Sequence, residues 1–219
     1  MNYQSLKTKQ RELRPDFSEN LALRVHRALS WLDKAEQCED DLDAQFIFLW
    51  IAFNAAYANE FDDTQRFSEQ ETFRNFIQRL CQLDKKEYLP NLVWHEFTGS
   101  IRVLLANKYV FKPFWDYHNQ KISESDWQAQ FKSANTKANK AIGNKDTTVV
   151  LSIVFSRLYM LRNQLLHGGA TWNSGVNRDQ IRDSVNFLSK FVPCVIDIMM
   201  SSNNANIIWG DACFPVIDK

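Results

Sequence analysis

Three polar side chains, Arg162, Asn163 and His167, lie at the end of a long apolar stretch of this chain. The planar guanidinium of an arginine can bridge two oxygens of a phosphate, and histidine is the side chain whose charge changes closest to neutral pH. An amide can orient an anionic group by hydrogen bonding. Together these residue types are suited to binding a phosphate ester and moving a proton on it.

The residues before this group predict the helix that positions it. Valine and leucine recur at steps of three and four residues, which is the pattern of the apolar face of a buried helix. The series is Val150, Val154, Leu158, Leu161 and Leu165. Gly168 and Gly169 follow, and glycine readily takes the left-handed conformation that ends a helix. We therefore expect His167 to lie in the last turn of this helix.

Helical geometry sets how the three polar groups lie relative to one another. With about 100° of rotation per residue, Asn163 and His167 stack on one face, and Arg162 lies roughly 140° from His167. The rest of the helix is apolar on nearly every side, so we expect the cluster to line a cleft or a contact between subunits. Free carbonyl groups at a helix end favour a positively charged imidazole. His167 would then be ready to carry a proton near neutral pH.

A second apolar stretch, residues 41–57, predicts another buried helix. Its aromatic residues recur on one stripe, at Phe46, Trp50, Phe53 and Tyr57. Asn54 interrupts this stretch, and a buried amide needs hydrogen-bond partners. Two interpretations stay open: Asn54 bonds to a neighbouring backbone group or tyrosine, or it lies near Arg162 and orients it.

The segment from Arg162 to His167 resembles the motif of the HEPN superfamily, in which an arginine, a polar residue and three further residues precede a histidine. HEPN domains are small helical domains, many of which are metal-independent RNA endonucleases. Residues 41–57 look like the second helix of that family. The resemblance covers roughly residues 18–59 and 147–201 as a core of about four helices. It implies a single domain, 1–219, with an HEPN-like up-and-down bundle and a helical insertion at 61–142.

The resemblance also implies a reaction. The 2′-hydroxyl of RNA attacks the adjacent phosphorus and leaves a 2′,3′-cyclic phosphate and a free 5′-hydroxyl, without a metal or another cofactor. His167 would move the proton, Arg162 would stabilise charge on the phosphoryl oxygens, and Asn163 would orient one of these oxygens by hydrogen bonding. Members of the family commonly form homodimers in which both motifs meet at a two-fold axis. Many are toxins, some in phage defence, that an antitoxin partner such as a nucleotidyltransferase neutralises.

Two other interpretations of the motif remain. Many relatives do not cleave anything, so the chain could be a non-catalytic HEPN-like module that binds RNA, a nucleotide or a protein partner. In the simplest interpretation, Arg162 forms a salt bridge at a helix end and His167 caps carbonyl groups.

Charge restricts where RNA can bind. The 219 residues include 26 basic and 26 acidic ones, so no overall cationic field draws the chain to nucleic acid. A helix that opens with a capping box at Ser123–Asp126 carries lysines around its later half. The best local basic patch is formed by Lys132, Lys137, Lys140 and Lys145. Such lysines are also common on a solvated helix face. Trp172, in the loop after His167, could stack on a base or pin the turn.

We therefore take Lys140, Lys145 and Trp172, together with Asn54, as candidate substrate-binding residues. The aromatic segment 108–118 offers two interpretations as well, because its rings could stack on bases or anchor the segment to the core.

Composition favours an all-α, cytoplasmic protein. Only six glycines and five prolines occur, and little strict alternation predicts strands. The longest apolar runs are shorter than a membrane span, and the N-terminus lacks the apolar region of a secretion signal. The cysteines at 38, 81, 194 and 213 are widely spaced, which suggests neither a metal site nor a disulfide framework.

The N-terminal part predicts one more core helix. Leucine and valine recur at helical spacing from a cap at Asp16 or Ser18 to about Gln37. Arg24 falls on the outer face of this predicted helix. Residues 1–15 are polar and basic, and they predict an irregular arm or one short helix.

Overall fold

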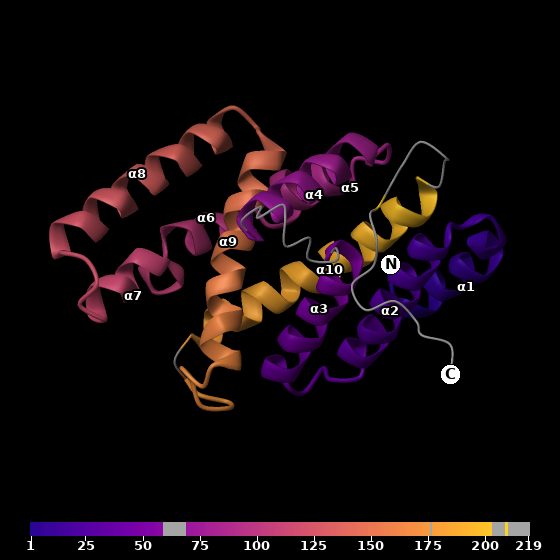
Figure 1. Ribbon diagram of the computed structural model, residues 1–219, viewed down its shortest axis with the longest axis horizontal. Helices are drawn as coiled ribbons and strands as arrows, with labels where there is room; N and C mark the ends of the chain where they lie inside the picture. The colour runs from indigo at the N-terminus through magenta and orange to yellow at the C-terminus, as the bar shows by residue number, and fades with distance from the viewer. Residues whose placement is uncertain (59–68, 176, 203–208, 210–219) are drawn as a thin grey trace, which may run out of the picture.

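The computed structural model describes residues 1–58, 69–175, 177–202 and 209, and residues 61–68 of the predicted insertion lie outside these ranges. Every regular element in the described ranges is a helix, which confirms the predicted all-α class (Figure 1). The α-helices are α1 (Tyr3–Leu13), α2 (Glu19–Glu36), α3 (Leu42–Tyr57), α4 (Glu69–Leu83), α5 (Tyr88–Asn91), α6 (Thr98–Ala106), α7 (Lys112–His118), α8 (Glu124–Gly143), α9 (Thr147–Leu166) and α10 (Arg178–Ser201). Shorter helical turns are η1 (Arg14–Asp16), η2 (Leu92–Glu96) and η3 (Lys108–Val110).

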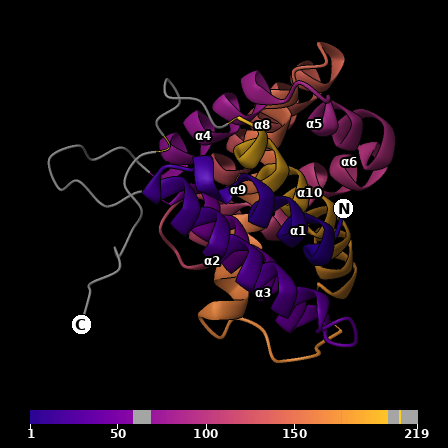
Figure 2. The ribbon, with the colours of Figure 1, turned by 90° about the vertical axis from the view of Figure 1, so that its right-hand side faces the viewer.

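The helices α2, α3 and α10 pack against one another, and α1 covers α2 and α10. Figure 2 shows α1, α2 and α3 on one side of the molecule, with α10 and α9 behind them. The predicted stripe of α3 is buried, because Phe46, Trp50 and Phe53 are at most 2% exposed. The side chains of this layer therefore supply one wall of the core.

The helix α9 runs obliquely across α10 and joins this layer to the rest of the chain (Figure 1). Its Phe155 ring lies 4.4 Å from the Phe53 ring and 4.8 Å from the Phe191 ring, measured between centroids. On its other sides α9 packs against α4, α6 and α8. The helix α4 lies inside the predicted insertion, yet it buries Phe73 and Ile77 in the same core.

Two of the described helices, α9 and α10, are long and apolar enough to cross a membrane by length and composition alone. The apolar part of α10 is 78% buried by the other helices and that of α9 is 39% buried. Burial of this kind is compatible with core helices of a soluble protein.

Arg24 is not on the outer face, so that prediction was wrong. It is 1% exposed, and its Nη1 donates to the carbonyl oxygens of Ala56, at 3.1 Å, and Ala58, at 2.8 Å. These carbonyls belong to the end of α3, where the last groups of a helix lack partners within the helix. Arg24 therefore caps α3 and fixes α2 against it.

The first residues form the helix α1, capped by reciprocal hydrogen bonds between Asn2 and Ser5. Its Lys9 contacts the buried carboxylate of Asp197 on α10, and Lys86 contacts the other oxygen at 3.2 Å. Burial raises the pKa of Asp197, but the hydrogen bonds and charges of Lys9 and Lys86 outweigh burial and lower that pKa below its ordinary value of 3.8. The ion pair therefore fastens α1 to the core.

Replacing Lys9 by methionine is expected to lower the free energy of unfolding by about 1–2 kcal/mol at pH 7, because Asp197 then keeps only Lys86. A carboxyl group with a lowered pKa stabilises the fold above its unfolded pKa and loses this effect as the pH falls through the folded value. The difference in unfolding free energy between variant and wild type should therefore shrink as the pH falls below 3.8, the ordinary pKa of an aspartate. Urea unfolding at pH 7 and pH 3 measures it, with exposed Lys34→Met on α2 as control.

Candidate functional site

The end of α9 has the geometry that the glycines predict. Gly168 has a φ of +71°, and the backbone N–H of Gly169 donates to the carbonyl oxygen of Gln164 at 2.8 Å. A Cβ atom on Gly169 would lie 3.1 Å from that oxygen, which is too close without a shift of the backbone. His167 is the residue that closes the helix. The chain therefore turns sharply away just after the imidazole.

The guanidinium of Arg162 has a neutral partner. Its Nη1 donates to Oδ1 of Asn163 at 2.8 Å, and its central carbon lies 5.8 Å from the centroid of the Tyr159 ring. Among the described residues no carboxylate pairs with Arg162, and its buried Nε has no acceptor. The salt bridge of the simplest interpretation is therefore not formed within the described part of the chain, and the positive charge stays available.

His167 is exposed, and its backbone N–H donates to the carbonyl oxygen of Asn163 at 3.0 Å. This bond uses the backbone of His167, whereas its imidazole makes no hydrogen bond to the residues that the structure describes. Leu166, the preceding residue, and Trp172, in the loop that follows, are also exposed, at 46% and 74%. An imidazole in this position can reach a ligand or a second subunit.

A cleft of about 800 Å³ opens beside this helix end. It lies between α9, α8, the segment that leads into α7, and one aromatic side chain of α4. The lining residues are Phe73, Val110, Phe111, Lys112, Pro113, Gln130, Ser133, Ala134, Lys137, Ser156, Arg157, Tyr159, Met160 and Asn163. Both side chains that Arg162 contacts, Tyr159 and Asn163, are in this set. Arg162 therefore lies at the edge of the cleft, and none of the described residues that line it is an aspartate or a glutamate.

The aromatic segment 108–118 serves mainly as an anchor. Phe114 is buried, and its ring contacts those of Tyr109 and Trp127 at 5.4 Å and 5.3 Å. The exception is Phe111, which lines the cleft. The segment thus holds α7 on α8 and gives one ring to the cleft.

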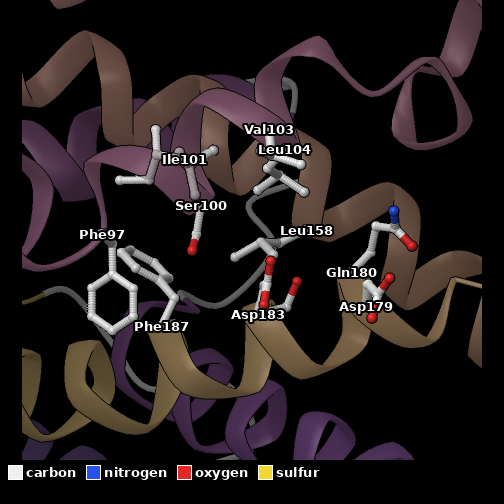
Figure 3. A pocket seen from close by; sticks show the side chains of 12 residues that line it. Phe97, Ser100, Ile101, Val103, Leu104, Leu158, Asp179, Gln180, Asp183 and Phe187 are labelled. Atoms are coloured by element: carbon white, nitrogen blue, oxygen red, sulfur yellow. The ribbon is translucent and has the colours of Figure 1, made fainter.

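A second hollow, between α6 and α10, is too small for a nucleotide. Its volume is about 40 Å³, which is room for a few water molecules. Figure 3 shows the carboxylates of Asp179 and Asp183 beside it. Negative charge at that position would repel a phosphate, so the cleft beside Arg162 is the better candidate site.

Lys140 and Lys145 are not brought to the motif. Lys140 is in the last turn of α8, and Lys145 precedes the first residue of α9. The 20 residues of α9 separate them from His167, a distance of roughly 30 Å at about 1.5 Å per residue. The lysine of α8 that the structure brings to the cleft is Lys137.

The loop after His167 is tied to the start of α3. Trp172 Nε1 donates to Oδ2 of Asp41 at 3.0 Å, and the backbone N–H of Asn173 donates to Oδ2 of Asp43 at 2.8 Å. The hydrogen bond from the backbone of Ala44, followed in effect by that from Trp172, lowers the pKa of Asp41 against the opposing effect of burial. Trp172 therefore pins the turn, and its exposed ring remains free to contact a base.

Asn54 is half-buried on the last turn of α3, and its buried Oδ1 has no hydrogen-bond partner. Within the described residues, no hydrogen bond joins Asn54 to Arg162 or Asn163. Neither of its two predicted roles therefore has a formed contact among the described residues.

Arg157 is the residue that the sequence interpretation missed. It is 4% exposed, lines the cleft, and places its guanidinium carbon 4.3 Å from the centroid of the Phe111 ring. Burial lowers its pKa to about 10, so it is still charged at neutral pH. Its position is three residues after Val154 and four before Leu161, inside the apolar stripe. A charged residue at an apolar position was the available signal.

No group of three or more metal-binding side chains is placed to hold an ion in the described ranges. Cys38, Cys81 and Cys194 are free thiols, and Cys213 lies outside the described residues. Burial raises the pKa of Cys194 to about 12, so this thiol is unreactive at neutral pH.

Comparisons with protein-family models, with curated proteins and with solved structures found no match to this chain. The structure itself establishes the class, which is an all-helical protein. Any narrower assignment must come from the chemistry of the cleft and of the end of α9.

Proposed function

We propose that this chain is a metal-independent endoribonuclease of the HEPN type, with a toxin or defence role in the cytoplasm. The observation that supports it best is the environment of Arg162. Its charge has no acidic partner among the described residues, it borders a cleft whose described lining carries no carboxylate, and the exposed His167 lies at the same helix end. Cleavage of RNA uses both groups: the arginine stabilises the negative charge of the phosphodiester, and the histidine moves a proton of the reacting hydroxyl groups.

The reaction follows from the RNA chain itself. The 2′-oxygen forms a bond to the adjacent phosphorus, and the bond from phosphorus to the 5′-oxygen breaks. His167 accepts the proton of the 2′-hydroxyl or donates one to the leaving 5′-oxygen. Arg162 stabilises the charge on the phosphoryl oxygens, and Asn163 holds the guanidinium through its 2.8 Å hydrogen bond. The products are a 2′,3′-cyclic phosphate and a 5′-hydroxyl.

A homodimer completes the proposed site. Leu166, next to His167 in sequence, and Trp172, in the loop that follows, are large apolar side chains that stay exposed, and exposed apolar surface often marks a contact between subunits. A two-fold axis near them would bring two motifs together, so that each site combines Arg162 of one protomer with His167 of the other. An antitoxin such as a nucleotidyltransferase would neutralise this dimer.

The proposal predicts that the protein cleaves RNA in the presence of a chelator. Cleavage should leave 2′,3′-cyclic phosphate and 5′-hydroxyl ends, which terminal labelling after phosphatase and kinase treatment identifies. Arg162→Ala should lower the rate by about 10²- to 10³-fold, the usual effect of removing a group that stabilises developing charge. The matched control is Arg102→Ala, an exposed arginine on α6. Cleavage that needs added metal, or that persists in Arg162→Ala, would contradict the proposal.

The cleft supports a second candidate, an HEPN-like module that binds RNA, a nucleotide or a protein without cleaving. Its volume of about 800 Å³ is within the range of small-molecule sites. The same assay separates the two candidates, because the module binds its ligand while the RNA stays intact.

A further inference from the structure

Arg157 is a buried cation without a formed anionic contact. Its Nε is enclosed by protein and has no acceptor, and no carboxylate pairs with it among the described residues. An unpaired buried charge is costly, and a guanidinium carries five N–H donors. The fold therefore keeps a strong donor group in the wall of a cleft where the protein itself does not use it.

Neighbouring side chains hold this guanidinium in place. The Phe111 ring packs on it at 4.3 Å, and stacking of a guanidinium on a ring fixes the plane of its donor groups. Arg157 is also flanked on α9 by the buried residues Val154 and Leu158. A donor group with a fixed direction loses little freedom when an anion binds to it.

The other residues of the cleft define what fits beside the anion. Lys112 and Lys137 add positive charge, and Lys112 is partly neutralised by Asp116. Phe111, Tyr159 and Met160 give aromatic and apolar surface, on which a flat or apolar body can pack. None of the described lining residues is acidic, so this lining suits an anion better than a cation.

We propose that the cleft binds a small organic anion, a carboxylate or a phosphate carried on an aromatic or apolar body, whose charged group accepts hydrogen bonds from Arg157. The body lies against Phe111, Tyr159 and Met160, and Lys137 attracts the anion at the exposed side of α8. This site does not depend on RNA cleavage. It shares Asn163 with the proposed nuclease site, so a bound anion would lie next to Arg162.

Matched pairs of probes test the charge requirement on the full chain without RNA. One pair is adenosine 5′-monophosphate and adenosine, and the other is indole-3-acetate and indole-3-acetamide. Calorimetric titration should show that at least one charged probe binds about tenfold or more tightly than its neutral twin. Equal binding of both members of each pair, or no binding of either anion, overturns the proposal. The pair that binds tells a phosphate from a carboxylate ligand.

Variants then test the residue. Arg157→Gln should weaken the bound anion by about tenfold or more, whereas Lys140→Ala, a loss of charge on α8 outside the cleft, should leave affinity unchanged. If Arg157→Gln does not fold, Ser133→Trp supplies the test. Ser133 is exposed at the rim, so an indole there fills the cleft without entering the core. Unchanged anion binding in a folded Arg157→Gln or Ser133→Trp protein places the ligand elsewhere and ends the proposal.

Discussion

Replacing His167 by alanine is expected to lower the rate of RNA cleavage by about 10²- to 10⁴-fold, the usual contribution of a general acid or base. The side chain is exposed at the end of α9 and forms no hydrogen bond to the described residues. Its removal therefore leaves no cavity, and the backbone bond of residue 167 to Asn163 remains. The thermal unfolding temperature should stay at the wild-type value while single-turnover cleavage of labelled RNA slows.

The matched control for this prediction is His26→Ala, which removes an exposed histidine from α2. It should cleave at the wild-type rate. If the His167→Ala protein cleaves RNA as fast as the wild type, this imidazole has no role in the reaction.

Mixing two inactive variants tests whether the site is shared between subunits. In a homodimer whose site combines Arg162 of one protomer with His167 of the other, a mixed dimer of Arg162→Ala and His167→Ala keeps one intact site. Random exchange should then restore about a quarter of the activity, since half of the dimers are mixed and each has one of two sites. A site within one protomer gives no recovery.

The elements that position the motif could be predicted because their signals are local. The apolar spacing of α9, the glycines after it and the capping residue Ser123 each act within a few residues, and the structure has all of them. Short-range rules of this kind do not depend on the remaining fold. The end of α9 was therefore placed correctly from sequence alone.

Buried charges were the part that sequence could not place. Arg24, Arg157 and Asp197 are each buried, and each is accommodated by groups distant in the chain: the end of α3 for Arg24, Phe111 for Arg157 and two lysines for Asp197. A helical pattern shows which face such a residue is on but not which group will meet it. Arg24 was for this reason predicted on the outer face.

Lys140 and Lys145 illustrate the same limit for the candidate site. They are close to α9 in sequence, but they join it at the opposite end from His167. Among the lysines of α8, Lys137, which is one turn before Lys140, lines the cleft instead. Nearness along the chain is therefore a poor guide to position along a long helix, since each further residue moves the side chain by about 1.5 Å along the helix axis.

Replacing Phe155 by alanine is expected to lower the free energy of unfolding by about 3–5 kcal/mol, as is usual for a buried phenylalanine. Phe155 is fully buried, and its ring contacts those of Trp50, Phe53, Phe73, Phe187 and Phe191, which come from α3, α4 and α10. Truncation leaves a cavity where α9 meets α3, α4 and α10. Urea unfolding monitored by circular dichroism measures the loss.

Two further variants separate this junction from ordinary packing. Phe155→Leu keeps most of the volume and should cost less than about 1.5 kcal/mol. Phe131→Ala also removes a phenyl ring, but from α8. Phe131 is half-buried and contacts only Phe111 and Trp127 among the described rings. Its loss should lower the free energy of unfolding by about 1 kcal/mol. If Phe155→Ala were as mild as Phe131→Ala, α9 would not be held by the core at this point. The helix that carries Arg157, Arg162 and His167 would then lack the rigid support that both proposed sites require.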